Sequence, residues 1–323
     1  MTNQGKKKWF NKKKKEETIE DFIPPYLGNM VLPYHGDFCF SRIFHYKLLC
    51  QLCSEGFLPI ATDGVLLPKL HAQRCVIALP TDLHISKSTR KKSKKYSVTV
   101  NKAFDQVIIG CQQQHGDRCW LYPPLVRAFK EINQRGHVNA EVFEDKGRRS
   151  TGRVCPVRLY SIEVWDSDKN MVAGELGYTV GSIYTSLTGF SSQDSAGSVQ
   201  LCALGKMLCS LGFSMWDLGM EMAYKFSLGA KLMPREQFLN HVWSVREPKG
   251  FLVLPADHEA LNAKCLIDEL PLCDAVQSKV ETEETNGNNA KGKVQTKHPS
   301  SSQKECVPPE KKRLKNTQST APM

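Results

Sequence analysis

The chain has 323 residues, of which 41% are hydrophobic, and this is enough for one large or two ordinary domains with a sizeable core. No apolar run approaches the roughly 20 residues that cross a bilayer, so the sequence predicts no membrane-spanning helix. The net charge of +11, with a pI near 9.0, favours a polyanionic partner such as a nucleic acid.

The N-terminal residues and the cysteines together predict an intracellular protein. Residues 1–20 are rich in lysine and lack the apolar segment of a secretory signal, and we expect them to be disordered. Twelve cysteines without such a signal predict reduced thiols, because the cytosol does not sustain structural disulfides. We therefore expect a cytoplasmic protein. The basic run Lys311–Lys315 adds the nucleus as a second location, although such runs also occur in solvated tails.

A first α/β domain is predicted over residues 21–95. Apolar residues at helical spacing indicate a helix over Phe40–Phe57, with Gly56 as its stop signal. The short apolar runs Val65–Leu67 and Arg74–Leu79 predict strands. A short basic helix closes the domain, and Ser86 and Ser88 are candidates for its N-cap.

A second domain is predicted over residues 96–255, followed by a disordered polar tail over 275–323. We expect strands at Tyr96–Asn101, Tyr160–Trp165, Met171–Val180 and Gly250–Leu254, and helices at Lys102–Cys111, Pro124–Gln134 and Glu236–Trp243. The polar, basic segment within Asn139–Tyr160 predicts a hairpin or a loop excursion.

The stretch Gly174–Arg235 carries the strongest functional signal. It predicts two short strands that lead to a turn at Gly189-Phe190, then an apolar helix and a third strand, Phe213–Leu218. Asp217 lies near the end of that third strand. A carboxylate in the last residues of an apolar strand is poorly placed for packing and well placed for chemistry.

Short motifs between Gly36 and Trp243 resemble the leucyl/phenylalanyl-tRNA–protein transferases in sequence and in order. They are Gly36-Asp37, Phe57-Leu58-Pro59, Leu83–Ser88, Val98–Phe104, Trp120, Ser161–Trp165, Gly174, Gly177, Asp217, Ser227–Ala230 and Pro234-Arg235. The resemblance implies an α/β (α+β) protein with an N-terminal α/β domain and an acetyltransferase-like (GNAT) domain. The implied reaction moves a leucyl or phenylalanyl group from charged tRNA to the N-terminal amine of an acceptor protein, which is thereby marked for degradation. We expect a monomer that does not bind membranes.

The chain departs from this family at three positions of the implied site. The family typically has Gly-Glu-Ser-Met-Phe where this chain has Ser186–Phe190, so Leu187 replaces a pocket glutamate. It has Asp-Cys-Gln where this chain has Asp217-Leu218-Gly219, so a glutamine proposed to assist catalysis is replaced by glycine. Glu175 replaces a hydrophobic residue of the side-chain pocket. The chain thus resembles a divergent, eukaryotic-type member, and a catalytically inactive homologue that binds tRNA or peptides is the alternative hypothesis.

The implied reaction is the aminolysis of an ester that is already activated, so it requires no metal, nucleotide or other cofactor. Asp217 is the first candidate to orient the attacking amine, with a turn or helix-cap role as the alternative. Glu221 lies four residues further on and either accepts the proton or is a surface carboxylate. Glu175 is either the counter-charge of a substrate amine or an outward-facing strand residue.

Two further sets of residues are implied to bind the substrates. The candidates for the substrate pocket are Trp120, Glu175, Tyr178, Tyr184, Leu187 and Phe190. Stacking of an aromatic ring on an unpaired base contributes about 1–3 kcal/mol, but core packing is the alternative for each of these rings. The candidates for tRNA binding are Lys87, Arg90, Lys91, Lys92, Lys94 and Lys95. Clustered cations suit RNA phosphates, and a solvated helix face is the alternative.

Two other ligands are disfavoured by the sequence. Acetyltransferases of the same fold present a Gln/Arg-x-x-Gly-x-Gly/Ala loop to coenzyme A, and Gln193–Ser198 does not have this spacing. Cys50 and Cys53 have the spacing of half a zinc site, but the sequence contains no second CxxC pair. Packing on one face of a helix explains these two cysteines more simply.

Overall fold

A mixed sheet of nine strands organises the residues that the computed structural model describes, which are 36, 38–144, 149–247, 252–256 and 259–268. The chain divides into two units, and these residues all lie in the first, Met1–Val280. The strands are β3 (Gln73–Ala78), β4 (Ser97–Val100), β5 (Val138–Glu144), β6 (Arg149–Trp165), β7 (Met171–Val180), β8 (Ile183–Ser191), β9 (Met215–Asp217), β10 (Lys231–Pro234) and β11 (Leu261–Asn262).

These strands lie in the order β10-β3-β9-β8-β7-β6-β4-β11, and β5 pairs with β6. Neighbouring strands are antiparallel except for β8 and β9, which are parallel. Helix α6 (Ala196–Ser210) makes the crossover between those two strands, as a parallel connection requires. A separate hairpin of β1 (Leu58–Thr62) and β2 (Val65–Lys69) completes the β-structure of the described residues.

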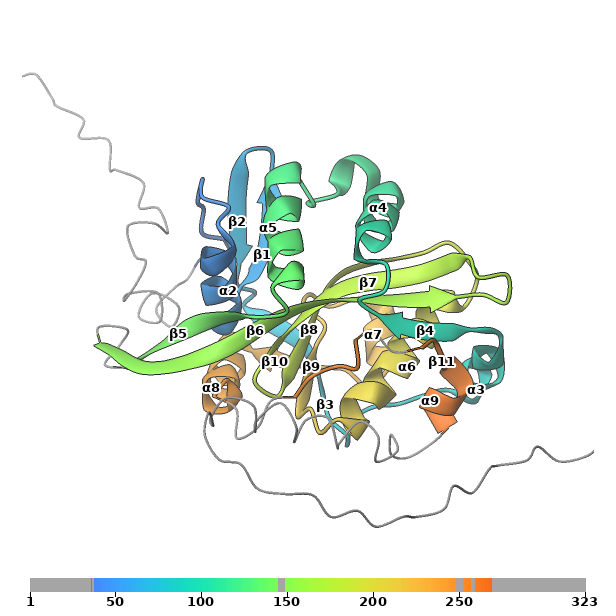
Figure 1. Ribbon diagram of the computed structural model, residues 1–323. Coiled ribbons are helices and arrows are strands. Elements are labelled where there is room, and N and C mark those ends of the chain that lie inside the picture. The colour runs from blue at the N-terminus through green and yellow to red at the C-terminus, as the bar shows by residue number, and fades with distance from the viewer. Residues whose placement is uncertain (1–35, 37, 145–148, 248–251, 257–258, 269–323) are drawn as a thin grey trace, which may run out of the picture. The chain divides into compact units, whose positions relative to one another are not determined.

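Helices cover both faces of the sheet (Figure 1). One hydrophobic core includes residues of α2 (Tyr46–Ser54), α4 (Phe104–His115), α5 (Pro123–Gln134) and α8 (Arg235–Val245). The other includes residues of α6 and α9 (Ala263–Asp268), against which the short basic helix α3 (Lys87–Lys92) packs. Because β7 lies between the two cores, nine of its ten residues are buried, which explains its apolar and small side chains.

The mixture of sheet and helices confirms a mixed α/β fold, and most predicted elements are present. Ser86 caps α3, because its side chain accepts a hydrogen bond from the Thr89 backbone N–H. The basic excursion predicted within Asn139–Tyr160 is a hairpin of β5 and β6, whose tip at 145–148 lies outside the described residues. Among the described residues, no helix is long and apolar enough to cross a membrane.

The predicted helix Phe40–Phe57 is too long at both ends. Before it, Ser41 exchanges backbone hydrogen bonds with Leu66 and is therefore held in an extended conformation. After it, β1 begins at Leu58, a strand that the sequence analysis missed. The Asp63-Gly64 pair between β1 and β2 is a typical hairpin signal and would have revealed this strand.

The turn predicted at Gly189-Phe190 is wrong, because β8 continues through both residues. Gly189 pairs with Glu175 of β7, and Phe190 pairs with Gly174. The Phe190 ring packs directly on Gly110 of α4. A Cβ atom added to Gly110 would lie only 2.5 Å from a carbon of this ring. Phe190 is therefore a strand residue whose ring packs on α4, and not a turn residue.

Three other predictions concern the ends and the domains. Residues 1–20, 250–251 and 275–323 lie outside the described residues, and 252–254 do not form a strand. Strand β3 belongs to the predicted first domain, yet it pairs with β9 and β10 in the same sheet. The domain boundary near residue 95 stays a prediction.

Candidate functional site

Asp217 lies at the end of a strand, close to where the sequence predicted it: it is the last residue of β9, and its side chain is completely buried. Its carboxylate accepts hydrogen bonds from Thr185 Oγ1 at 3.1 Å and from the Gly219 backbone N–H at 2.9 Å. It also pairs with Arg74, whose Nε lies 3.1 Å from Oδ1. Two neighbouring strands and the following turn therefore hold this carboxylate in one position.

Arg74 is the partner that the sequence analysis did not select. Its Nη2 donates to the Gly56 carbonyl at 2.6 Å, and its guanidinium lies 4.5 Å from the centre of the Phe238 ring. Only 1% of its side chain is exposed. Arg74 opens the apolar run of β3, so the criterion that selected Asp217, a charged residue at the end of an apolar strand, would also have found it.

Glu175 is a second buried carboxylate, so the outward-facing alternative is wrong. Tyr184 Oη, Ser186 Oγ and Gln200 Nε2 lie 3.0, 2.8 and 2.7 Å from its oxygens, and each donates a hydrogen bond. Burial raises the pKa of Glu175 above its usual value, and these three donors oppose the shift. Three neutral donors therefore bind the carboxylate directly, and the charge of Lys225 also opposes the shift.

Asp217 and Glu175 lie on opposite faces of the sheet. Thr185 donates to Asp217, whereas its neighbours Tyr184 and Ser186 donate to Glu175. Successive side chains of a strand point to opposite faces, so the two carboxylates cannot share one face. Glu175 faces α6, which supplies Gln200, and Asp217 faces the core that contains Phe238.

Lys225 of α7 (Ala223–Ser227) lies close to both networks. Its side chain is buried, and Nζ donates to the carbonyls of Leu218 and Met220, each at 2.6 Å. Burial lowers the pKa of Lys225, and the negative charges of Asp217 and Glu175 are among those that oppose this shift. The lysine thereby fixes the turn that follows Asp217, in which Gly219 has a φ of +74°. Its sequence context did not identify it as a functional residue.

Leu187, which replaces the pocket glutamate of the family, is the extra residue of a bulge in β8. Leu176 pairs with Thr188 and Gly177 pairs with Ser186, which leaves Leu187 without a partner. Its half-buried side chain packs on the same core as Phe190. Bulges are common beside active sites, because they change the direction of a side chain.

The predicted pocket residues do not gather at one place. Tyr178 and Tyr184 are buried on opposite faces, and their hydroxyls donate to the Phe57 carbonyl and to Glu175. Neither ring is exposed enough for a base to stack on it, so both are core residues in this structure. Trp120 is half-buried and packs edge-to-face on Phe129 at 6.4 Å.

The predicted catalytic partner and the tRNA-binding cations lie at the surface. Glu221 is exposed, and no ion pair to it is found within the described ranges. On α3, Arg90 pairs with Asp268, and Lys92 lies 2.7 Å from Ser195 Oγ. The remaining four lysines, Lys87, Lys91, Lys94 and Lys95, are exposed.

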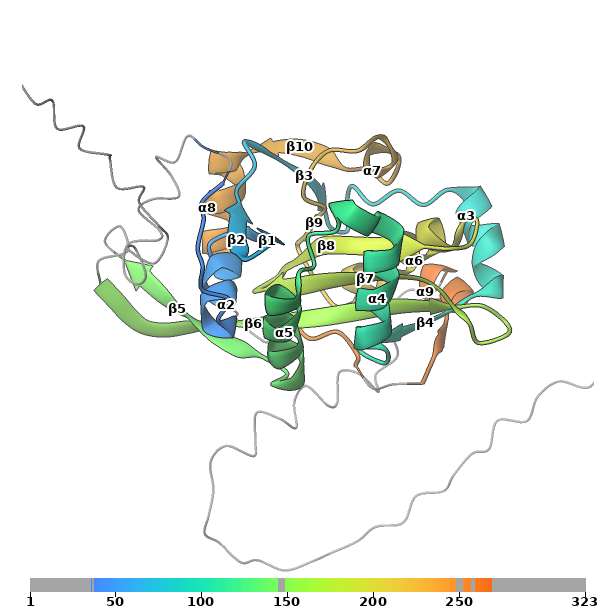
Figure 2. The same ribbon diagram turned by 90° about the horizontal axis from the view of Figure 1, so that it is seen from above.

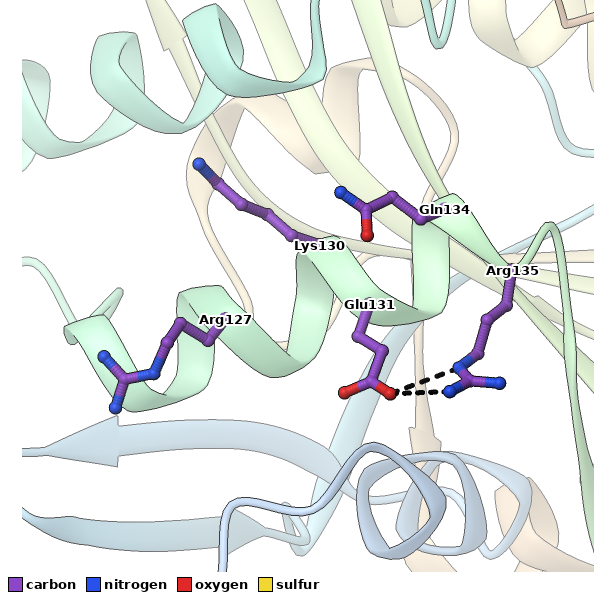
Figure 3. Close-up of a pocket in the computed structure, with 5 residues that line it drawn as sticks. All are labelled: Arg127, Lys130, Glu131, Gln134 and Arg135. Carbon is purple, nitrogen blue, oxygen red and sulfur yellow. Dashed lines mark hydrogen bonds and ion pairs between the residues drawn. The ribbon is translucent and has the colours of Figure 1, made fainter.

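Three hollows of the described surface are lined by residues of neither carboxylate network. One, of about 420 Å³, is lined by Arg127, Lys130, Glu131, Gln134 and Arg135 on the exposed side of α5 (Figure 3). Within it, Glu131 accepts a hydrogen bond from Arg135 Nη2 at 2.8 Å. Another includes Lys92 and Lys95 but also Asp166, Asp168 and Asp194, so its charge is mixed. In the described segments, no group of three His, Cys, Asp or Glu residues could hold a metal ion.

Comparison with known proteins identifies relatives of the whole site region. The family model for leucyl/phenylalanyl-tRNA protein transferases matches residues 76–243, just over half of the chain and a range that includes both carboxylates. The transferase of Edwardsiella ictaluri is 27% identical over 200 residues, which cover 61% of this chain and 74% of that protein. That of Pectobacterium atrosepticum is 28% identical over 216 residues, or 66% and 80%.

The alignment with one solved structure, L-PGS from Bacillus licheniformis, covers 46% of this chain and 45% of the L-PGS chain. Its TM-score of 0.29 and 10% identity are too low to bear on the fold. The family match rests instead on the sequence from β3 to α8, a range that contains Asp217 and the turn after it. The chain therefore belongs to the leucyl/phenylalanyl-tRNA protein transferase family of aminoacyltransferases.

Proposed function

We propose that this protein transfers an aminoacyl group, leucyl or phenylalanyl, from charged tRNA to the N-terminal amine of an acceptor protein. The observation that carries the proposal is the fixed Asp217 carboxylate at the end of β9, inside the region that the family model matches. The degradation of the acceptor, which the family resemblance implies, is part of the same proposal.

The acetyltransferase-like arrangement is also proposed. The antiparallel run β6-β7-β8, followed by the crossover helix α6 and the parallel strand β9, supports it. The bulge at Leu187 of β8, beside the parallel strand β9, supports a substrate cleft at the ends of β8 and β9.

The α-amine of the acceptor attacks the ester carbonyl, a C–N bond forms, and the 3′ oxygen of the tRNA leaves with the electrons of the broken C–O bond. The attacking nitrogen must lose a proton, and the leaving oxygen must gain one. Glu221 is exposed, so it is the candidate that accepts the proton from the amine.

Asp217 has no exposed surface and acts as a positioning residue. Its carboxylate holds the Gly219 N–H, and Lys225 holds the carbonyls on either side of Gly219. Together they fix the backbone of the turn that leads to Glu221. The proposed base, Glu221, is therefore already in position before the substrates react.

The test is the transfer of labelled leucine or phenylalanine from charged tRNA to peptides that begin with Arg, Lys, Asp or Glu. Transfer to at least one of these peptides is expected, with Glu221→Gln strongly reduced in kcat. If no peptide accepts the label while charged tRNA still binds, the protein is a binding homologue without transferase activity. The loss of the family glutamate at Leu187 favours that second function.

A further inference from the structure

Five large apolar side chains are exposed in one short segment beside the candidate site. They are Met220, Met222, Tyr224, Phe226 and Leu232, and each is between 39% and 54% exposed. We call them the α7 patch. The rest of the described chain exposes four large apolar side chains, at Phe38, Ile43, Ile109 and Val154, and no two of them are fewer than five residues apart. A cluster of this kind on a surface marks a binding site for another molecule.

The α7 patch is continuous with the candidate site. Met220 follows the turn at Gly219, whose N–H binds Asp217, and the Met220 carbonyl accepts a hydrogen bond from Lys225. The backbone under the patch is thus anchored to buried groups, while its apolar side chains remain outside. From α7 the chain leads into β10, an edge strand whose one neighbour among the described strands is β3 (Figure 2).

The charge of this segment disfavours RNA as its occupant. Between Gly219 and Ala230, Glu221 is the one carboxylate, and it is exposed. Lys225 is the one cation there, and its buried side chain faces the interior. Lys231, next to Leu232 of the patch, is 70% exposed, but its Nζ pairs with Asp82 at 2.9 Å. Glu221 is then the one exposed charge of the segment with no ion pair among the described residues. The surface of the segment is therefore apolar and slightly negative, although the whole chain has a net charge of +11. RNA phosphates are repelled by such a surface, whereas a cationic, partly apolar polypeptide complements it.

We propose that the α7 patch binds the polypeptide that follows the N-terminal residue of the acceptor, as an extended segment with apolar side chains and a net positive charge. This inference rests on the proposed function, because it assigns a place to the acceptor of that reaction. Two methionines in the patch adapt their shape to different side chains, so the patch tolerates many acceptor sequences.

The test compares two acceptors that share their first residue, a two-residue amide and a twelve-residue peptide that continues with apolar and basic residues. The variant Met222→Ser/Phe226→Ser removes two exposed side chains, and the fold should survive because neither is part of a core. KM for the long acceptor should rise roughly tenfold, since two partly buried contacts are lost. KM for the two-residue amide and for charged tRNA should not change.

A matched control is Ile109→Ser/Val154→Ser, which removes two exposed apolar side chains outside the patch. It should leave every KM unchanged. Equal effects on the short and long acceptors, or none on either, would overturn the proposal. A raised KM for charged tRNA would identify RNA as the occupant, and a change of mass in sedimentation would identify a second copy of the chain.

The binding of the fluorescently labelled long peptide separates this proposal from the proposed function. Anisotropy measured on the full chain should show weaker binding to the patch variant than to the control variant. If the peptide binds in this way but no transfer occurs, the proposed reaction fails while the docking surface stands. If transfer occurs but both variants bind the peptide equally, the docking surface fails alone.

Discussion

Tyr184 and Thr185 are neighbours in β8, yet their hydroxyls donate to two different buried carboxylates, Glu175 and Asp217, on opposite faces of the sheet. A single strand therefore connects two polar networks that have no side chain in common. Lys225 of α7, which binds the carbonyls of Leu218 and Met220 after the end of β9, is close to both charges. Each network can consequently be altered by a separate substitution.

The substitution Asp217→Asn should abolish transfer while the affinity for tRNA stays within a few-fold. It removes the charge that pairs with Arg74, and an unpaired buried cation costs about 3–5 kcal/mol of unfolding free energy. Denaturant unfolding and transfer assays measure the two effects. The double variant Arg74→Met/Asp217→Asn should recover stability but not activity. Wild-type rates in either variant would remove Asp217 from the mechanism.

Glu175 should make the protein less stable as the pH rises. Burial raises its pKa in the folded state above 4.5, so the folded state binds the proton more tightly than the unfolded state. Its contribution to stability is complete below pH 4.5 and is lost as the pH rises through the raised pKa. Glu175→Gln should lack this contribution. Urea unfolding of both proteins across that pH range gives the difference, and parallel curves would contradict the prediction.

Gly177→Ala should destabilise the fold by about 2 kcal/mol, because a small residue becomes overpacked. A Cβ at this position would lie 2.1 Å from Tyr184 Oη and 2.8 Å from the Thr185 carbonyl. Tyr184 would have to move, and Glu175 would lose one of its three donors. Thermal unfolding measures the loss. An unchanged melting temperature would show that β7 and β8 can separate at little cost.

Reversal of three exposed lysines on and beside α3, Lys91, Lys94 and Lys95 to Glu, should weaken tRNA binding and flatten its dependence on salt. Each lost phosphate contact lowers the slope of log K against log salt by about 0.7–0.9. The matched variant reverses Arg127 and Lys130, which line the hollow on α5 (Figure 3). Titrations at several salt concentrations decide between them. A slope that changes only in the α5 variant would place the RNA there.

The free cysteines should make the protein labile at high pH. Burial raises the pKa of Cys111 and of Cys155 to about 12, from an ordinary value of 9.0. Above pH 9 the unfolded thiols ionise first, so each group lowers stability by about 1.4 kcal/mol per pH unit up to pH 12. Cys111→Ala should lose stability less steeply over this range than the wild type. Equal slopes in alkaline unfolding curves would refute the assignment.

The sequence by itself determined most of the elements and the place of Asp217 near a strand end, because apolar periodicity and strand ends are local properties. β7, α6, β9 and the capped helix α3 follow from such patterns. The hairpin of β1 and β2 was also predictable in principle from Asp63-Gly64. The motifs that resemble the family were sufficient to indicate the reaction, and those from Leu83 to Arg235 lie inside the range that the family model matches.

Only the tertiary structure decided what each charged residue contacts. Arg74 and Asp217 are separated by 143 residues, and their pairing arises because β3 and β9 are neighbours in the sheet. Whether Glu175 faces solvent or a core depends on which side α6 covers, and whether Leu187 forms a bulge depends on the register of β7 and β8. Strand order is set by packing between distant segments, and a bulge shifts the register that a local alternating pattern predicts, so neither could be taken from the sequence.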